Sequence, residues 1–142
     1  MSDFLCKALN FLDFQAARWL NDGDVPAQEG NEHPTITSMG TYAASDGLVN
    51  VAGIGSWKRF CATLDAPSLT DDPRFATNAE RLRHRPELRT ELEAILAKAT
   101  VSGWVDRLND ACFPAGPVLR VDETFSDPQV VASGRSAPSW ND

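Results

Sequence analysis

A hairpin expected over residues 41–52 constrains the fold more than any other feature of the sequence. The turn Asp46-Gly47 is typical of tight hairpin connections, because both of its residues tolerate positive φ. Alternate residues of a strand share one face, so Val49 and Val51 are expected on the same side of the second strand. The sequence therefore predicts a short antiparallel sheet in this part of the chain.

Helical patterns dominate the chain after the hairpin. The capping-box spacing from Thr77 to Glu80 predicts a helix through about Arg85. The next helix is expected over residues 86–98, and Thr100 is a suitable cap for a third. The other expected elements are a short helix capped by Ser56, an extended piece over residues 118–121, and one or two helical turns over residues 122–131. We therefore expect an α+β fold, a short antiparallel β-sheet with three to four helices.

A long apolar helix is expected before the hairpin, over residues 4–20. Its apolar side chains recur at steps of three and four, and aromatic side chains widen the stripe until little of the helix faces solvent. The side chains concerned are Leu5, Leu9, Leu12, Ala16 and Leu20, together with Phe4, Phe11, Phe14 and Trp19. Gly23 is expected to end this helix. A helix of this kind normally lies against a partner element, so we expect it to need a covering surface.

Composition excludes several classes of protein. The 142 residues include 13 Lys and Arg against 20 Asp and Glu, a net charge of −7 that disfavours nucleic acid and anionic membranes as partners. The 42% of hydrophobic residues suffice for one folded core, and no apolar run approaches the roughly 20 residues of a membrane-spanning helix. The first residues lack the basic segment of a secretory signal.

The cysteines argue against disulfide and metal chemistry. Cys6, Cys61 and Cys112 are odd in number and widely spaced, without a C-x-x-C pair. We therefore expect no disulfide framework, no metal site and a reducing, cytoplasmic location. Each cysteine has apolar neighbours in the sequence, which predicts that all three are inert thiols in the core.

Few side chains suggest chemistry by themselves. An arginine cluster could clamp a phosphate group, but acidic residues lie close to it in the sequence, and local charge balance is the favoured interpretation. Its members are Arg81, Arg83, Arg85 and Arg89. His33 could face a ligand from its loop, although a surface role is the simpler interpretation, and His84 is expected at a solvated helix end. The residues alone predict an α+β module and no function.

Seven short motifs, however, occur in a recognisable order. They are Gly30-Asn31-Glu32-His33-Pro34, Asp46-Gly47, Val49-Asn50-Val51, Asp71-Asp72-Pro73-Arg74-Phe75, Thr77-Asn78 with Arg81 beyond, Pro114-Ala115-Gly116-Pro117-Val118, and Asp127-Pro128-Gln129-Val130. This order resembles the family III CoA-transferases, the CaiB/BaiF family, which also contains the α-methylacyl-CoA racemases. One departure is Met39-Gly40, where many members have Pro-Tyr.

The resemblance implies an activity and an assembly. Members of the family move coenzyme A from an acyl-CoA to a carboxylic acid, through an aspartyl-CoA thioester. Coenzyme A thioester is then a substrate, and no cofactor is bound permanently. The family fold has a large and a small domain, and two chains interlock as a homodimer. By this resemblance residues 1–23 are the linker helix, residues 24–131 the small domain, and residues 132–142 a frayed C-terminal segment.

The resemblance also implies where the site residues lie. The family nucleophile is the first aspartate of a D-x-S-[LM]-x-D pattern, and Met1-Ser2-Asp3 is similar to the last three positions. The nucleophilic aspartate is therefore expected upstream of Met1, in a fragment of a longer enzyme. Asp3 is an alternative nucleophile, or simply a helix cap. Gly30, Asn31 and His33 are expected to bind substrate, since their loop resembles the one that covers the active site.

Two other functions stay open on this sequence. A racemase of the same family would move an α-proton with a pair of bases, and the residues that distinguish it from a transferase are expected upstream of Met1. A non-catalytic interaction module could also retain the small-domain fold. Its acidic surface and apolar first helix would then bind a partner protein.

Overall fold

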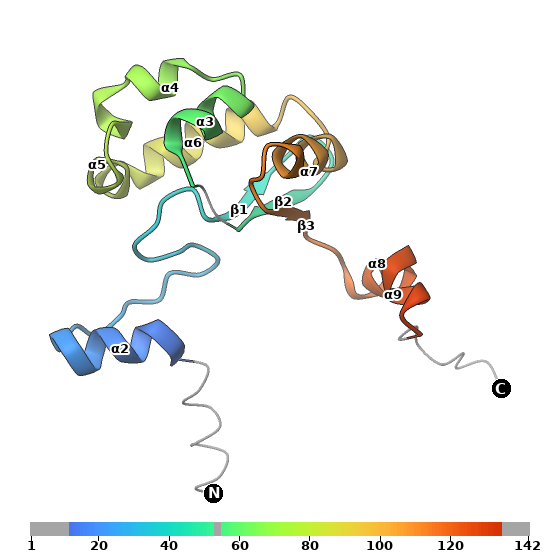
Figure 1. The fold of residues 1–142 in the computed structure, drawn as a ribbon, viewed down its shortest axis with the longest axis horizontal. Helices are drawn as coiled ribbons and strands as arrows, with labels where there is room; N and C mark the ends of the chain where they lie inside the picture. The colour runs from blue at the N-terminus through green and yellow to red at the C-terminus, as the bar shows by residue number, and fades with distance from the viewer. Residues whose placement is uncertain (1–11, 53–54, 135–142) are drawn as a thin grey trace, which may run out of the picture. The chain divides into compact units, whose positions relative to one another are not determined.

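The computed structural model describes residues 12–52 and 55–134. These residues form α-helices and a three-stranded antiparallel sheet (Figure 1), so the expected α+β class is confirmed. The chain divides into two compact units, one ending at Gly30 and the other beginning at Asn31. The first unit contributes one described helix, and the second contains the whole sheet.

The helix of the first unit, α2, spans Asp13–Asp22. It ends at Gly23, which has a φ of 68° and whose N–H donates to the Trp19 carbonyl at 3.0 Å. Glycine adopts this left-handed conformation at little cost, and the predicted stop is confirmed. Trp19 is 54% exposed and Leu20 78% exposed, which agrees with the expectation of a helix that needs a covering surface. Residues 4–11 of the expected helix lie outside the described residues.

The sheet belongs to the second unit. Its strands, in the order β1-β2-β3, are β1 (Gly40–Ala43), β2 (Leu48–Val51) and β3 (Ala115–Pro117). Both pairings are antiparallel, with Tyr42 opposite Val49 and Val49 opposite Pro117. Val49 and Val51 are 0% and 1% exposed, as the alternation predicted. The predicted hairpin is therefore confirmed.

The third strand corrects one expectation. An extended piece was expected over residues 118–121, but β3 covers Ala115–Pro117 and a helix begins at Val121. The Asn109 side chain explains the earlier start of the strand, because its amide bonds both the N–H and the carbonyl of Ala115, each at 3.0 Å. These two hydrogen bonds take the place of those that a neighbouring strand would make, and they hold Ala115 in extended form.

The helices of the second unit are short, and several of them begin at a side-chain cap. They are α3 (Trp57–Thr63), α4 (Ser68–Asp71), the 3₁₀ turn η2 (Pro73–Phe75), α5 (Asn78–Arg83), α6 (Arg85–Leu96), α7 (Val101–Asp110), α8 (Val121–Ser126) and α9 (Pro128–Ala132). Ser56, Thr77 and Thr100 each accept a backbone N–H three residues on, which confirms all three predicted caps. Asp72 likewise accepts the Arg74 N–H at 2.9 Å, so it has the expected turn role.

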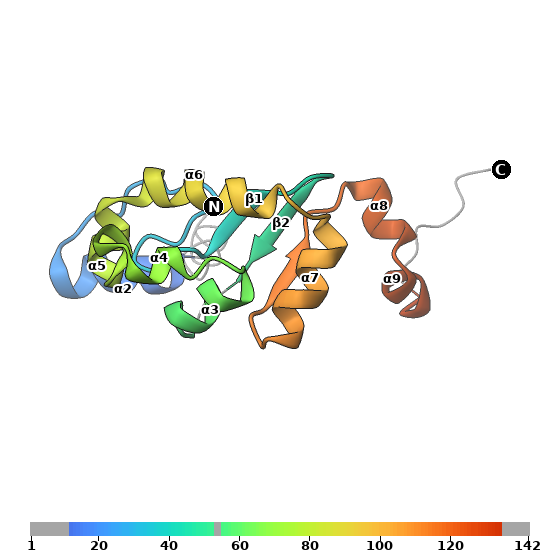
Figure 2. The same ribbon diagram turned by 90° about the horizontal axis from the view of Figure 1, so that it is seen from above.

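One core joins the sheet to its helices. α6 packs along β1, and α7 packs along β2 and β3, as Figure 2 shows. Leu88, Leu92 and Leu96 from α6 are all at most 2% exposed. The Phe60 and Phe113 rings meet edge to face with centroids 5.5 Å apart. The core includes Tyr42, Val49, Val51, Phe60, Cys61, Leu64, Leu69, Phe75, Trp104, Leu108 and Phe113.

The cysteines follow the prediction only in part. Cys61 lies in the core at 0% exposure, but Cys112 is exposed, which contradicts the expectation of a core thiol. Cys112 has a left-handed φ of 59° at the end of α7. The reversal there directs Phe113 into the core and leaves the preceding side chain outside. Cys6 lies outside the described residues.

The described residues offer neither a membrane helix nor a cluster for a metal ion. No helix among them combines the length and the apolar character needed to cross a bilayer. Within the same ranges, no three His, Cys, Asp or Glu side chains gather in a way that could hold a metal.

Candidate functional site

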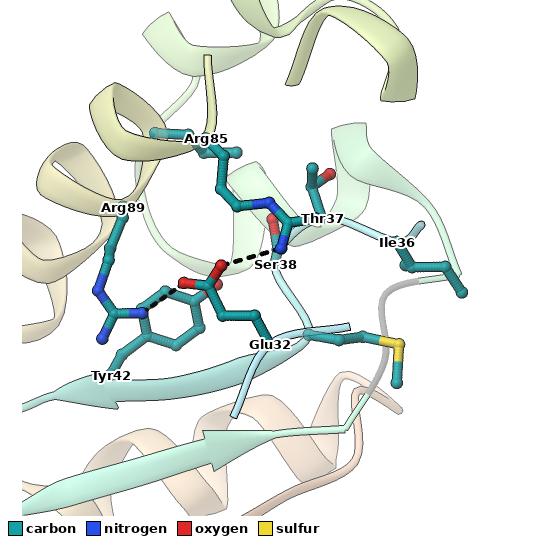
Figure 3. A pocket seen from close by; sticks show the side chains of 9 residues that line it. Glu32, Ile36, Thr37, Ser38, Tyr42, Arg85 and Arg89 are labelled. Atoms are coloured by element: carbon teal, nitrogen blue, oxygen red, sulfur yellow. Dashed lines mark hydrogen bonds and ion pairs between the residues drawn. The ribbon is translucent and has the colours of Figure 1, made fainter. Parts of the chain in front are cut away.

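The segment from Asn31 to β1 contains most of the motif expected to bind substrate, and an ion-pair network secures it. Glu32 accepts hydrogen bonds from Arg85 Nη1 at 2.9 Å and from Arg89 Nη1 at 2.7 Å (Figure 3). Arg85 Nη2 also donates to the His33 carbonyl at 2.9 Å, and Arg89 Nη2 donates to the Thr41 carbonyl at 2.9 Å. Two arginines of α6 therefore hold both the loop and the first strand.

Residue spacing explains why one helix supplies both arginines. Arg85 and Arg89 are four residues apart, so they lie on the same face of α6, one turn from each other. Glu93 follows one turn later and pairs with Arg89 at 2.9 Å. Leu88 and Leu92 of the same helix are buried, and α6 packs against β1. The two arginines therefore lie beside the first strand.

Burial and nearby charges both act on the pKa values of the acidic groups in this network. Burial alone would raise the pKa of the Glu32 carboxyl, but Arg85 and Arg89 outweigh that effect and hold the pKa below its ordinary 4.5. Burial, with the Glu32 charge, raises the pKa of Tyr42 to about 12. The Arg89 guanidinium lies 5.3 Å from the centre of the Tyr42 ring. We call these four residues, Glu32, Tyr42, Arg85 and Arg89, the Glu32 cluster.

The Glu32 cluster leaves almost no space for a ligand. The pocket that it lines with Ser38 has a volume of about 10 Å³, enough for about one water molecule. Since both arginines are already paired with carboxylates, the cluster positions the loop and has no charge to offer a substrate.

This pairing corrects the expectation of local charge balance among the arginines in part. Arg83 pairs locally with Glu80 at 2.9 Å, and Arg89 pairs locally with Glu93. Arg85 and Arg89 reach Glu32, which is 53 and 57 residues away in the sequence. The sequence reasoning missed Glu32, although it is the acidic residue inside the quoted loop motif and faces two arginines at helical spacing.

A second set of contacts holds the end of the same loop. The Asn78 side chain, at the start of α5, accepts from the Thr37 N–H at 3.4 Å and from its hydroxyl at 3.2 Å. The Asn78 amide donates to the Thr35 carbonyl at 2.8 Å. Arg81 Nε, one turn later, donates to the Thr37 hydroxyl at 3.1 Å. The two motif residues Asn78 and Arg81 therefore bind one turn of the loop.

Arg81 is the unusual member of this second set. It is 8% exposed, and Nη1 donates to the Phe75 carbonyl at 2.7 Å. Its guanidinium lies 4.6 Å from the centre of the Trp57 ring. It pairs with no acidic side chain of the described ranges, and burial lowers the pKa of Arg81. We call Arg81, Thr37, Asn78 and Trp57 the Arg81 cluster.

Two buried polar atoms, one in Trp57 and one in Ser38, lack hydrogen-bond partners among the described residues. Trp57 Nε1 and Ser38 Oγ are enclosed by protein and make no hydrogen bond with the described residues. Ser38 follows Thr37 directly and has a left-handed φ of 66°, a strained conformation for a residue with a side chain. Buried polar groups are nearly always bonded, so each of these atoms calls for an explanation.

The structure describes all three residues predicted to bind substrate. Gly30 has a left-handed φ of 62°, and Asn31 is exposed. The His33 Nδ1 accepts the backbone N–H groups of Thr35 at 3.2 Å and Ile36 at 3.1 Å. Through these two contacts the His33 ring fixes the backbone of the next turn. Substrate binding by these residues stays a prediction.

The other sequence candidates do not join the loop. His84 lies 3.4 Å from Glu87 at the junction of α5 and α6, at the expected helix end. Asp3, the alternative nucleophile, lies outside the described residues.

Comparison with known proteins gives one consistent result. The family model of CoA-transferase family III matches residues 4–138. The acetyl-CoA:oxalate CoA-transferase of Acetobacter aceti is 32% identical over 126 residues, which are 87% of this chain and 32% of that enzyme. The succinate–glutarate CoA-transferase of Agrobacterium fabrum is 32% identical over 122 residues, 84% of this chain and 30% of that enzyme.

A solved structure agrees with these relatives. A CaiB/BaiF family protein from Brucella suis superposes with a TM-score of 0.74 and 34% identity, over 87% of this chain and 33% of that protein. The chain therefore spans about a third of the length of the proteins that it matches. From its motifs, its fold and these similarities, the chain belongs to CoA-transferase family III.

Proposed function

We propose that this chain is part of an enzyme that transfers coenzyme A from an acyl-CoA to a carboxylic acid. The observation that carries the proposal is the family match over residues 4–138, together with two relatives that are both CoA-transferases by name. We further propose that residues 1–23 are the linker helix, residues 24–131 the small domain and residues 132–142 a frayed end. The enzyme would act in the cytoplasm as an interlocked homodimer.

The proposed chemistry uses one aspartate as a covalent carrier. Its carboxylate attacks the acyl-CoA carbonyl and expels the CoA thiolate, giving an acyl-aspartyl anhydride. The thiolate then attacks the aspartyl carbonyl, releases the donor acid and leaves an aspartyl-CoA thioester. The acceptor carboxylate reverses these two steps, so that the acceptor leaves as its CoA thioester and the aspartate is regenerated.

We place this aspartate in protein outside the 142 residues. The chain corresponds to about a third of each relative, so most of a catalyst of that length is contributed by other sequence. In this proposal the chain supplies the loop over the reaction centre. Gly30, Asn31 and His33 contact the substrate, and backbone N–H groups of such a loop can stabilise the oxyanions that form.

The Glu32 cluster supports this role for the loop. A loop that covers a reaction centre must be held in one geometry, because small misplacements of a reacting group are costly. Four hydrogen bonds from Arg85 and Arg89 hold residues 32–41 to α6. These contacts preorganise the loop before any substrate arrives.

The relatives also suggest the acceptor. Oxalate, succinate and glutarate, the acids in the two names, each have two carboxylates. We therefore propose a dicarboxylic acid as the acceptor for this enzyme.

A chimera tests the proposal. The aligned segment of the Acetobacter aceti transferase is replaced by the matching residues of this chain, and CoA esters are separated by chromatography after incubation with acetyl-CoA and oxalate, succinate or glutarate. We expect CoA transfer by the chimera and none by the 142-residue chain alone. A folded chimera without transfer would contradict the function, and transfer by the chain alone would contradict the external aspartate.

A further inference from the structure

We propose that Arg81, lying against Trp57, binds the unreacted carboxylate of a dicarboxylic acid acceptor. The inference rests on the proposed function for the identity of the acid, and on the Arg81 cluster for the binding site. One carboxylate of such an acceptor becomes the thioester, while the other keeps its charge throughout the reaction and needs a cationic partner.

The first argument is the cost of a buried cation without an anion. A charged side chain taken out of water loses several kcal/mol of solvation unless an opposite charge compensates it. Arg81 is the buried charged residue of the described ranges, and no acidic side chain there pairs with it. A bound carboxylate would supply the missing charge.

The second argument is the set of groups around Arg81. Nε donates to Thr37 and one N–H of Nη1 to Phe75, while the second N–H of Nη1 and both of Nη2 make no hydrogen bond with the described residues. The indole N–H of Trp57, the ring against which Arg81 lies, is a donor without an acceptor among the described residues. A carboxylate is the ligand that needs only donors, and guanidinium groups bind it with two parallel hydrogen bonds.

The third argument is location. The Thr37 hydroxyl that accepts from Arg81 belongs to the loop that contains His33 and Asn31. Arg81 is 8% exposed, so the residue is not wholly enclosed. An acid bound to Arg81 lies beside the loop that is proposed to cover the reaction centre.

The indole N–H signals of the 15N-labelled full chain test the inference without any activity. The four tryptophans give four such signals, and the signal that is missing from Trp57→Phe belongs to the Trp57 indole. The Trp104 signal is an internal control, because Trp104 Nε1 already donates to the Leu96 carbonyl at 2.7 Å. The chain is titrated with glutarate at constant ionic strength, and in parallel with inorganic phosphate and chloride.

We expect glutarate to shift the Trp57 signal saturably and to leave the Trp104 signal in place. Arg81→Gln should abolish the shift, and Arg81→Lys should weaken binding roughly tenfold or more, because an ammonium cannot make the two parallel bonds. Arg107→Gln is the matched control. Arg107 lies 5.3 Å from the Trp104 ring centre but pairs with Asp65 at 2.7 Å, so its loss should leave the titration unchanged.

Three results would overturn the inference. They are a Trp57 signal that glutarate does not move in the folded chain, an equal shift in folded Arg81→Gln, and phosphate or chloride binding as tightly as glutarate. The dispersion of the remaining signals shows whether each variant is folded. Carboxylate binding without CoA transfer by the chimera would contradict only the proposed function, whereas transfer without binding would contradict only this inference.

Discussion

Two arginine clusters hold the same loop, but within the described part of the chain only the first pairs each of its arginines with a carboxylate. In the Glu32 cluster, one carboxylate is shared between Arg85 and Arg89, and Glu93 pairs with the second arginine. In the Arg81 cluster, a more deeply buried guanidinium has hydroxyl, carbonyl and aromatic neighbours, and no carboxylate of residues 12–52 or 55–134 pairs with it. The difference separates two uses of a cation, since the paired arginines stabilise the fold and the unpaired one retains charge for a ligand.

Removal of the shared carboxylate should give the largest effect on stability. Glu32→Gln removes the carboxylate that the half-buried Arg85 and Arg89 share, and we expect the free energy of unfolding to fall by about 2–3 kcal/mol. Urea denaturation at neutral pH measures it. The matched control is Glu93→Gln, which breaks one pair along α6 and should cost about 0.5 kcal/mol. Equal losses in both variants would contradict the central place of Glu32.

The neutral contacts of the other cluster should matter less. Asn78→Ala removes three hydrogen bonds to Thr35 and Thr37 at an exposed helix start, and we expect a loss of about 1–2 kcal/mol. Asn78→Asp keeps the acceptor for Thr37 and loses the donor to Thr35, so its stability should be intermediate. If Asn78→Ala cost more than Glu32→Gln, the neutral contacts, and not the ion pairs, would dominate the loop.

The stability due to Glu32 should depend on pH. The pKa of its carboxyl lies below the ordinary 4.5 in the folded chain, because the two arginines outweigh the effect of burial. A group of this kind contributes stability that is complete above its unfolded pKa and is lost as the pH falls through the folded pKa. The difference between wild type and Glu32→Gln should therefore be constant above about pH 6 and narrow below about pH 4.5. Urea denaturation at a series of pH values measures it, and a constant difference down to about pH 3 would contradict the ion pairs.

Much of the fold could be predicted because its signals are local. The Asp46-Gly47 turn and the caps at Ser56, Thr77 and Thr100 act over a few residues, and each is confirmed. The start of β3 was missed because the Asn109 side chain sets it through a tertiary contact. No periodicity in the sequence encodes such a contact.

The candidate site was harder to predict for the same reason. The pairing of Arg85 and Arg89 with Glu32 spans more than 50 residues, and nearby acidic residues favoured the wrong, local partners. Among the described residues no acid pairs with Arg81, which depends on the face of α5 that is buried, and the sequence does not show this. Family motifs identified the loop, and only the structure separated its paired arginines from the unpaired one.

The smallest expected effect is also the strictest test of this comparison. Arg81→Met replaces a buried, uncompensated charge by an apolar side chain of similar length, so relief from desolvation should offset the lost bonds to Thr37 and Phe75. We expect the free energy of unfolding to stay within about 1 kcal/mol of wild type, whereas Arg85→Met should lower it by about 1–3 kcal/mol. Urea denaturation of both variants measures the contrast. If the two losses were equal, Arg81 would be a structural residue whose charge the chain already satisfies, and a bound carboxylate would have nothing left to compensate.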